Sequence, residues 1–248
     1  MKESTVVEEQ ASTLETCKTE LTERGWTLLG PHLLHDGVRA TLARFGEIVP
    51  QFGGQETFEV ALKPGFDKLP YSQSKNGIGP HTEAPVYDPP PKYLVLHCHR
   101  QARCGGGHTL LADGFAFYGT LDPELKEWAL NHPVTFTAAA EPGSKERRVH
   151  HASIMSDKDG APVFRFSYNL FRFGDVNPSE ADMAAADARD DKEPLTRIAQ
   201  MGEQFFKENM IPVLIPDESV LIWDNRRLMH ARSQFSDPGR HLTRYWLN

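Results

Sequence analysis

Three polar side chains, two of them close together and one distant in the sequence, have the chemistry of a metal site. His81 and Glu83 are separated by one residue, so on a β-strand both point to the same face. His230 offers a third ligand, and we refer to these three residues as the triad. Two histidines and one carboxylate bind Fe(II) and leave three coordination positions open. The pair also fits an exposed turn, and His230 also fits a histidine packed in a core.

The residues before His230 indicate how it reaches the other two. The apolar run "VLIW" predicts a strand, Asp224 and Asn225 are typical of a tight turn, and His230 follows on the next strand. In a barrel-like sheet this return places His230 beside the first pair.

Three further residues suit a ligand with two carboxylates. Arg240 and Arg244 are four residues apart, so on a strand they share a face. A guanidinium there can bind the far carboxylate with two parallel hydrogen bonds, which a lysine does less well. Thr109, in "GGGHT", is expected to begin a strand, and its hydroxyl could donate to the same carboxylate.

A zinc site is the alternative use for the cysteines and histidines between residues 97 and 108. Cys98 and Cys104 are six residues apart, wider than the spacing of structural zinc sites, and no second close pair of cysteines exists. On a strand, His97 and His99 face away from Cys98. We therefore interpret these residues as parts of a sheet, and Cys104, which has no activating base nearby in sequence, as structural.

The composition limits the classes of protein that fit. The 248 residues are 39% hydrophobic, and the formal net charge is -7 without a Lys/Arg cluster, so nucleic acid is not an expected partner. The acidic start "MKESTVVEEQ" lacks a signal-peptide pattern, and no apolar run is long enough for a bilayer. Three cysteines, a small and odd number, favour reduced thiols. We expect a cytoplasmic protein without a membrane partner.

The order of the predicted elements favours an antiparallel architecture. Strands fill the middle and the end of the chain and do not alternate with helices, which argues against a parallel sheet. We expect a single domain over residues 1–248, mainly β with flanking helices, of the jelly-roll type. A hairpin is expected at residues 148–169, around the turn "DKDG". Helices are expected at residues 8–24, 37–46, 122–132 and 178–209, the last interrupted at Pro194.

Four motifs, taken in order, resemble a known family. "HTE", "GGGHTLLADG", "WDNRRLMHAR" and "GRHLTRYWL" are similar to motifs of the taurine dioxygenase superfamily of Fe(II)/2-oxoglutarate-dependent oxygenases. The resemblance covers residues 80–248, whereas residues 1–70 share only the order of helix and then strand. It implies a double-stranded β-helix, which is a cupin-like jelly roll, and an enzyme that uses Fe(II), 2-oxoglutarate and O2.

The same resemblance implies roles for individual residues. The triad would bind the iron, while Thr109 and Arg240 would hold the distal carboxylate of 2-oxoglutarate. Arg244 matches a second family arginine, which either supports the cosubstrate or meets the substrate.

One departure from the commonest family pattern bears on the substrate. Most members carry aspartate where Glu83 stands, and glutamate there resembles the branch of clavaminate synthase and of the asparagine and arginine hydroxylases. The resemblance implies a biosynthetic dioxygenase that oxidises an unactivated C–H bond of an amino-acid-like small molecule. Hydroxylation is the expected outcome, and desaturation or cyclisation are alternatives. A non-oxygenase jelly roll, such as a cupin-like sensor or a zinc hydrolase, would have no use for Thr109 and Arg240.

Candidate substrate contacts lie in two segments. Tyr71 and Asn76 come just before the strand of the first metal ligand and could belong to a lid. Arg165 and Arg172, in "VFRFSYNLFRFG", could bind a substrate carboxylate. The alternative is a half-buried strand with a solvated face, because polar and aromatic residues alternate there. Residues 147–148, two arginines, could line the mouth of the site.

Overall fold

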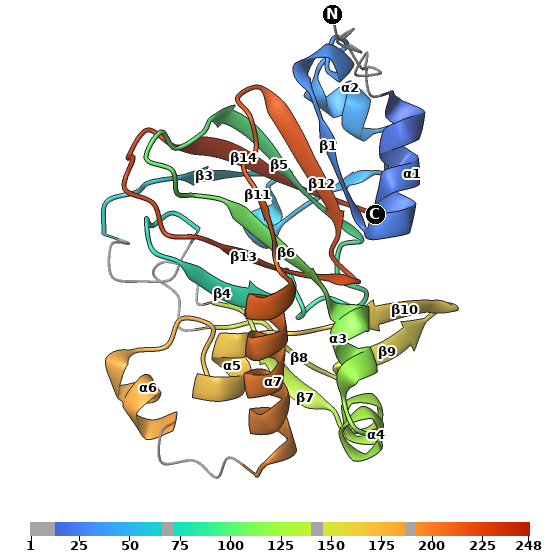
Figure 1. The fold of residues 1–248 in the computed structure, drawn as a ribbon, viewed down its shortest axis with the longest axis vertical. Coiled ribbons are helices and arrows are strands. Elements are labelled where there is room, and N and C mark those ends of the chain that lie inside the picture. Colours follow the sequence, from blue (N-terminus) through green and yellow to red (C-terminus); the bar gives the residue numbers. More distant parts are fainter. Residues whose placement is uncertain (1–12, 66–71, 140–145, 187–191) are drawn as a thin grey trace, which may run out of the picture.

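The fold consists of two antiparallel sheets with helices on their outer faces, seen in a computed structural model that describes residues 13–65, 72–139, 146–186 and 192–248. Figure 1 shows the strands of these two sheets in the upper part of the view, and α3 to α7 in the lower part together with β7 to β10. The expectation of a mainly β protein with flanking helices is confirmed. Among the described residues, no helix is long and apolar enough to cross a membrane.

The larger sheet has six strands. The central strands pair in the order β1-β12-β5-β14, and both β2 and β3 pair with β14. All of these pairs are antiparallel, as expected from the sequence. Its strands are β1 (Trp26–Leu29), β2 (Ile48–Val49), β3 (Thr57–Ala61), β5 (Tyr93–Arg100), β12 (Ser219–Asp224) and β14 (His241–Leu247).

The smaller sheet has four strands in the order β11-β6-β13-β4. Two separate pairs, β7 with β8 and β9 with β10, complete the β-structure of the described residues. These strands are β4 (Ile78–His81), β6 (Thr109–Asp113), β7 (Val134–Thr137), β8 (Val149–Ala152), β9 (Met155–Lys158), β10 (Ala161–Phe164), β11 (Ile211–Val213) and β13 (Leu228–Arg232).

The two sheets pack face to face, and residue alternation decides which side chains lie between them. Leu94 and Leu96 of β5 belong to the same buried cluster as Leu228 of β13. Val95, which points the other way, packs with the helices outside the larger sheet. On β13, Met229 faces the helices outside the smaller sheet. Because side chains alternate along a strand, His230 and Arg232 therefore point between the sheets with Leu228.

Helices cover both outer faces. Those at the start of the chain pack on the larger sheet through Cys17 and Leu21, while α3, α4, α5 and α7 pack on the smaller sheet around Phe117 and Phe166. The helices are α1 (Leu14–Arg24), α2 (Val38–Leu42), α3 (Gly114–Thr120), α4 (Pro123–Asn131), α5 (Tyr168–Phe173), α6 (Glu180–Ala186) and α7 (Pro194–Asn209), with single 3-10 turns η1 (Pro31–Leu33) and η2 (Phe52–Gly54).

The predicted elements are mostly present, with two differences. The α4 prediction is correct, and the Asp122 side chain accepts from the Leu125 amide at 2.8 Å as its N-cap. The hairpin prediction is correct only around Asp159 and Gly160, since β8 pairs with β7 and not with β10. Residues 168–169, predicted to end the second strand of the hairpin, instead begin α5. The predicted start of the first helix, before residue 13, lies outside the described residues.

Candidate active site

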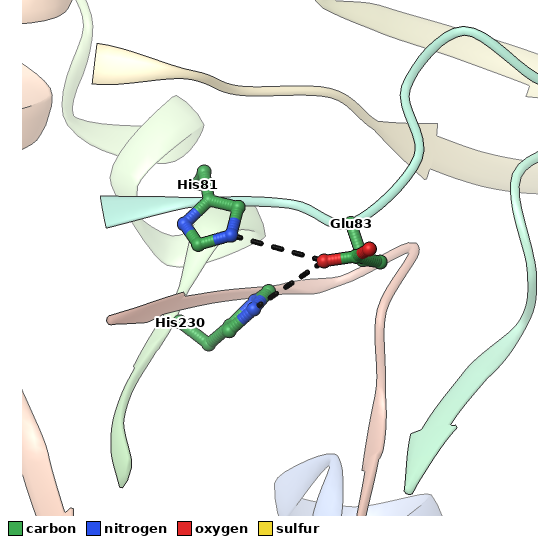
Figure 2. Close-up of side chains that lie close together, drawn as sticks. All are labelled: His81, Glu83 and His230. Carbon is green, nitrogen blue, oxygen red and sulfur yellow. Dashed lines mark ion pairs between the residues drawn. The ribbon is translucent and has the colours of Figure 1, made fainter. Parts of the chain in front are cut away.

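The structure brings the three triad residues together from two neighbouring strands, β4 and β13, and from the segment that follows β4. His81 is the last residue of β4, and His230 of β13 stands directly opposite it in the antiparallel register. Glu83 follows two residues after His81, and Figure 2 shows its carboxylate pointing at both imidazoles. One ligand atom from each residue lies within 4.8 Å of the other two. This is the arrangement predicted from the spacing.

Distances within the triad suit a small metal ion at its centre. The Nε2 atoms of His81 and His230 lie 3.8 Å and 4.0 Å from Oε2 of Glu83. The centroids of the two rings lie 4.1 Å apart, and the ring planes are tilted by 44° to each other. Ligand atoms bound to one ion are typically about 2 Å from it, so atoms about 3–4 Å apart can share it.

The protonation of the histidines also fits a metal site. His81 Nδ1 lies 2.9 Å from the Gly79 carbonyl, so it carries the proton and donates, which leaves the Nε2 lone pair facing Glu83. Burial lowers the pKa of His81, although Glu83 beside it opposes the change. Burial lowers the pKa of His230 well below its usual value, and His81 and Arg244 add to this effect. Both rings are therefore neutral at neutral pH, the form that binds metals.

The backbone of Thr82 and Glu83 is fixed by residues from two distant segments of the chain. Asn225 Oδ1 accepts from the Glu83 amide at 2.7 Å, and its Nδ2 donates to the Glu83 carbonyl at 3.0 Å. One residue earlier, the Thr82 amide donates to the Phe166 carbonyl at 2.8 Å, and the Thr82 hydroxyl accepts from the Phe166 amide at 3.0 Å. These contacts fix the backbone of Glu83 and therefore the direction in which its side chain points.

The Glu83 carboxylate has a second contact on its other oxygen. Arg244 Nη1 lies 2.8 Å from Glu83 Oε1, and Arg244 Nε donates to Gln51 Oε1 at 2.8 Å. The arginine guanidinium lies over the ring of Phe58, 4.7 Å from its centroid. Arg244 thus contacts a triad residue directly.

Arg240 and Thr109 lie beside a small cavity that also touches the triad. The cavity has a volume of about 70 Å³, and its lining includes His81, Glu83, His230, Thr109, Arg232, Arg240 and Arg244. Arg240 is 2% exposed, and among the described residues no carboxylate pairs with it. Burial lowers its pKa to about 10, so it remains a cation at neutral pH. A buried cation without a counter-ion suits an anionic ligand.

The comparisons with known proteins identify the family of this chain. The family described as "Taurine catabolism dioxygenase TauD, TfdA family" matches residues 8–246, nearly the whole chain. The chain belongs to this family. The resemblance seen in the four motifs is thus confirmed, and the protein is an Fe(II)/2-oxoglutarate-dependent dioxygenase, which uses O2. Family membership decides against the alternative of a cupin-like sensor or a zinc hydrolase. A search of curated proteins gives no significant match.

Solved structures of iron oxygenases have the same fold as this dioxygenase. An asparagine oxygenase in complex with Fe(II), 2S,3S-3-hydroxyasparagine and succinate has a TM-score of 0.66 at 15% identity, over 94% of this chain and 78% of that chain. The non-heme iron oxygenase OrfP with Fe and alpha-ketoglutaric acid has a TM-score of 0.63 at 17% identity, over 93% and 77%. PvcB, an oxygenase from an isonitrile synthetic pathway, has 0.61 at 16%, over 96% and 80%.

The dioxygenase has a second, larger pocket on the open side of the triad. Its volume is about 1000 Å³, and it shares His81, Glu83 and Arg244 with the small cavity. Arg147 and Arg148 line it, as the sequence suggested. Its other lining residues include Gln51, Phe52, Phe58, Thr82, Tyr87, Ser167, Asn169, Val176 and Asn177.

The other residues expected near the substrate lie elsewhere or have other partners. Tyr71 is outside the described residues. The Asn76 carbonyl accepts from Arg232 at 2.6 Å. Arg165 is 1% exposed and lies 3.1 Å from Asp88, and it does not line the large pocket. Residues 163–167 are all buried, so the polar positions Arg165 and Ser167 do not form a solvated face.

Arg172, the remaining expected contact, also stays outside the large pocket. Its Nη1 donates to the Ala186 carbonyl at 3.1 Å, which joins α5 to the end of α6. The contact of Arg172 described here is therefore structural, because it joins two helices.

Sequence reasoning missed four residues that shape the site: Gln51, Gln101, Asn225 as a backbone clamp, and Arg232. Arg232 could have been found by alternation, because it lies two residues after His230 on the same strand face. It donates to the carbonyls of Ser72 and Ser74, each at 2.8 Å, and so ties the edge of both pockets to β13. The three amides give no local signal, since their partners lie in distant segments.

Proposed function

We propose that this dioxygenase binds iron through His81, Glu83 and His230 and oxidises a C–H bond of an amino acid or amino-acid derivative. Hydroxylation is the expected outcome, with desaturation or ring closure as alternatives. The observation that supports this best is the position of the triad at the junction of two pockets, one small and cationic, the other large and open. A cosubstrate and a substrate can then approach the same centre from different sides.

We infer a double-stranded β-helix formed by one domain over residues 1–248. The two antiparallel sheets enclose a single apolar core, and the triad lies at one edge of the smaller sheet. This arrangement supports a jelly roll of the cupin-like kind. The three cysteines form no disulfide, and two of them are buried, which supports a reducing compartment such as the cytoplasm.

The small cavity is where the cosubstrate binds in this proposal. Arg240 pairs with the distal carboxylate of 2-oxoglutarate, and the Thr109 hydroxyl donates to the same group. Leu94, Leu96 and Trp223 form an apolar wall that keeps bulk water away. When bound, the iron supplies oxygen activation, coupled to the oxidative decarboxylation of 2-oxoglutarate to succinate.

The large pocket would hold the substrate with the reacting carbon next to the triad. Within the described residues, Arg147 is paired with Asp175, whereas Arg148 lies over the Tyr87 ring, 4.4 Å from its centroid, and pairs with no carboxylate. Arg148 is therefore suited to a substrate carboxylate. Structurally similar proteins carry 3-hydroxyasparagine and (3S)-hydroxy-L-Arg, which supports an amino-acid-type substrate.

The test combines spectroscopy with turnover. Fe(II) and 2-oxoglutarate, added without oxygen, should give the weak visible charge-transfer band expected of a chelated 2-oxoacid. In air, a panel of free amino acids should include one that increases succinate release. His81→Ala should lose both signals, while His132→Ala, a change of an exposed histidine at the end of α4, should keep them. Full turnover in His81→Ala would refute the proposed triad.

A further inference from the structure

Arg240, which directly precedes β14, and Arg244, which lies within it, are each held by a buried glutamine. Arg244 Nε donates to Gln51 Oε1 at 2.8 Å, and Arg240 Nε donates to Gln101 Oε1 at 3.3 Å. Both glutamines are 3% exposed. A glutamine–arginine contact of this kind thus occurs twice, once at Arg244 beside the triad and once at Arg240 beside the small cavity.

The amide of Gln51 can adopt only one orientation. Its Nε2 donates to the Glu56 carbonyl at 3.1 Å and to the Arg244 carbonyl at 2.9 Å. Reversing the amide would place its nitrogen against the N–H of Arg244 and its oxygen against two carbonyls. Gln51 therefore binds Arg244 twice, through the backbone and through the side chain, and fixes the plane of its guanidinium.

Held in this way, Arg244 reaches one oxygen of Glu83. Nη1 lies 2.8 Å from Oε1, and the guanidinium is packed between Phe58 and Trp246, 4.7 Å and 5.6 Å from their ring centroids. The other oxygen, Oε2, is the one that faces the two histidines. A charge-assisted hydrogen bond on Oε1 opposes rotation of the carboxylate.

We propose that Gln51 is a positioning residue for the metal centre: it holds Arg244 against Glu83, so that the carboxylate presents one oxygen to the metal. A carboxylate that bound through both oxygens would occupy one of the positions needed for other ligands. Gln101 has the corresponding role for Arg240 and the cosubstrate. The two arginines then have different functions. This proposal rests on the proposed function.

A matched pair of variants separates the two roles. Gln51→Leu removes the buried amide that accepts from Arg244, and Gln101→Leu removes the buried amide that accepts from Arg240. Co(II) serves as the metal probe, and its dissociation constant is measured by calorimetry. The affinity of the Co(II)-loaded protein for 2-oxoglutarate is measured in the same way. Near-ultraviolet circular dichroism and thermal melting report whether each variant is folded.

We expect opposite patterns from the two variants. Gln51→Leu should weaken Co(II) binding by about 10-fold or more, the usual effect of losing a residue that orients a metal ligand, and change 2-oxoglutarate affinity less. Gln101→Leu should weaken 2-oxoglutarate binding and leave Co(II) affinity within about 2-fold, because it touches no triad residue. Arg244→Lys keeps the charge but loses Nε, and should reproduce the Co(II) loss even if Gln51→Leu does not fold.

The double variant provides a further check. If Gln51 acts through Arg244, Gln51→Leu combined with Arg244→Lys should bind Co(II) no more weakly than Arg244→Lys alone. Fully additive losses would overturn the proposal, and so would unchanged Co(II) affinity in folded Gln51→Leu. A wild-type protein that binds no Co(II) would instead refute the proposed metal site, and this proposal with it.

Discussion

Asn225 holds the backbone of Glu83 from both sides. Its side-chain oxygen accepts from the Glu83 amide at 2.7 Å, and its side-chain nitrogen donates to the Glu83 carbonyl at 3.0 Å. The same nitrogen donates to the Pro91 carbonyl at 3.1 Å. Asn225 is fully buried, so no water can replace these contacts. The turn that precedes β13 thus fixes the backbone of Glu83, which has no strand partner in β13.

The first prediction concerns this clamp. Asn225→Leu should lower the free energy of unfolding by about 3 kcal/mol, because each buried polar group that loses its partner costs about 1–3 kcal/mol. It should also weaken Co(II) binding, since Glu83 loses its backbone support. Urea denaturation and calorimetry measure the two effects. Asn131→Leu, at an exposed position, is the control and should stay within about 0.5 kcal/mol of wild type.

Patterns within a few neighbouring residues were enough to predict several helices and strands. Alternating apolar residues predicted β5, and Asp122 followed by Pro123 predicted the start of α4. The same logic failed for residues 168–169, because the aromatic alternation of Phe164, Phe166 and Tyr168 continues past the end of β10 in the sequence. There, Leu170 and Phe171 pack into the core beneath the smaller sheet, and this tertiary contact favours helix.

The chemistry of the site was easier to predict than its supports. His81, Glu83 and His230 are recognisable because few residue types bind iron and because strand alternation gives their directions. Gln51 and Gln101 carry no such information, since a glutamine is ordinary at any polar position. Their roles depend on which distant segments pack against them, and only the three-dimensional fold shows that.

A second prediction concerns the glycine triplet before Thr109. A Cβ on Gly107 would lie 2.9 Å from Nε and 3.1 Å from Cδ of Arg240, so Gly107→Ala should displace this arginine and weaken 2-oxoglutarate binding. Gly105→Ala is the matched control. Both glycines have φ near +80°, so both variants carry similar backbone strain, but nothing lies within 4 Å of a Cβ at Gly105. Equal 2-oxoglutarate affinities in the two variants would contradict the prediction.

A third prediction concerns the packing of α7 behind the triad segment. A Cβ on Gly202 would lie 2.5 Å from the ring of Phe166, the residue that pairs with Thr82. Gly202→Ala should therefore destabilise the fold by about 1–3 kcal/mol, despite the better helix propensity of alanine. Gly119→Ala, within α3, meets nothing within 4 Å and should stabilise by up to about 1 kcal/mol. Chemical denaturation measures the free energy of unfolding of both variants, which should fall in Gly202→Ala and rise in Gly119→Ala.

The last prediction concerns Cys104, which sequence reasoning treated as structural. Its side chain is exposed, and hydrogen bonds from the backbone of Ser236, Gly106 and Asp237 lower its pKa to about 6. Because the thiolate is the reactive form, alkylation by iodoacetamide should rise through pH 6 and level off by about pH 7, well below the range of an ordinary thiol.

The other two cysteines provide the internal control for this measurement. Cys98 is buried, and burial raises its pKa to about 12, so it should not react in the folded protein, and neither should the buried Cys17. Mass spectrometry of tryptic peptides assigns the modified residue at each pH. A half-maximal rate near pH 8 to 9 would show that the backbone amides do not stabilise the Cys104 thiolate.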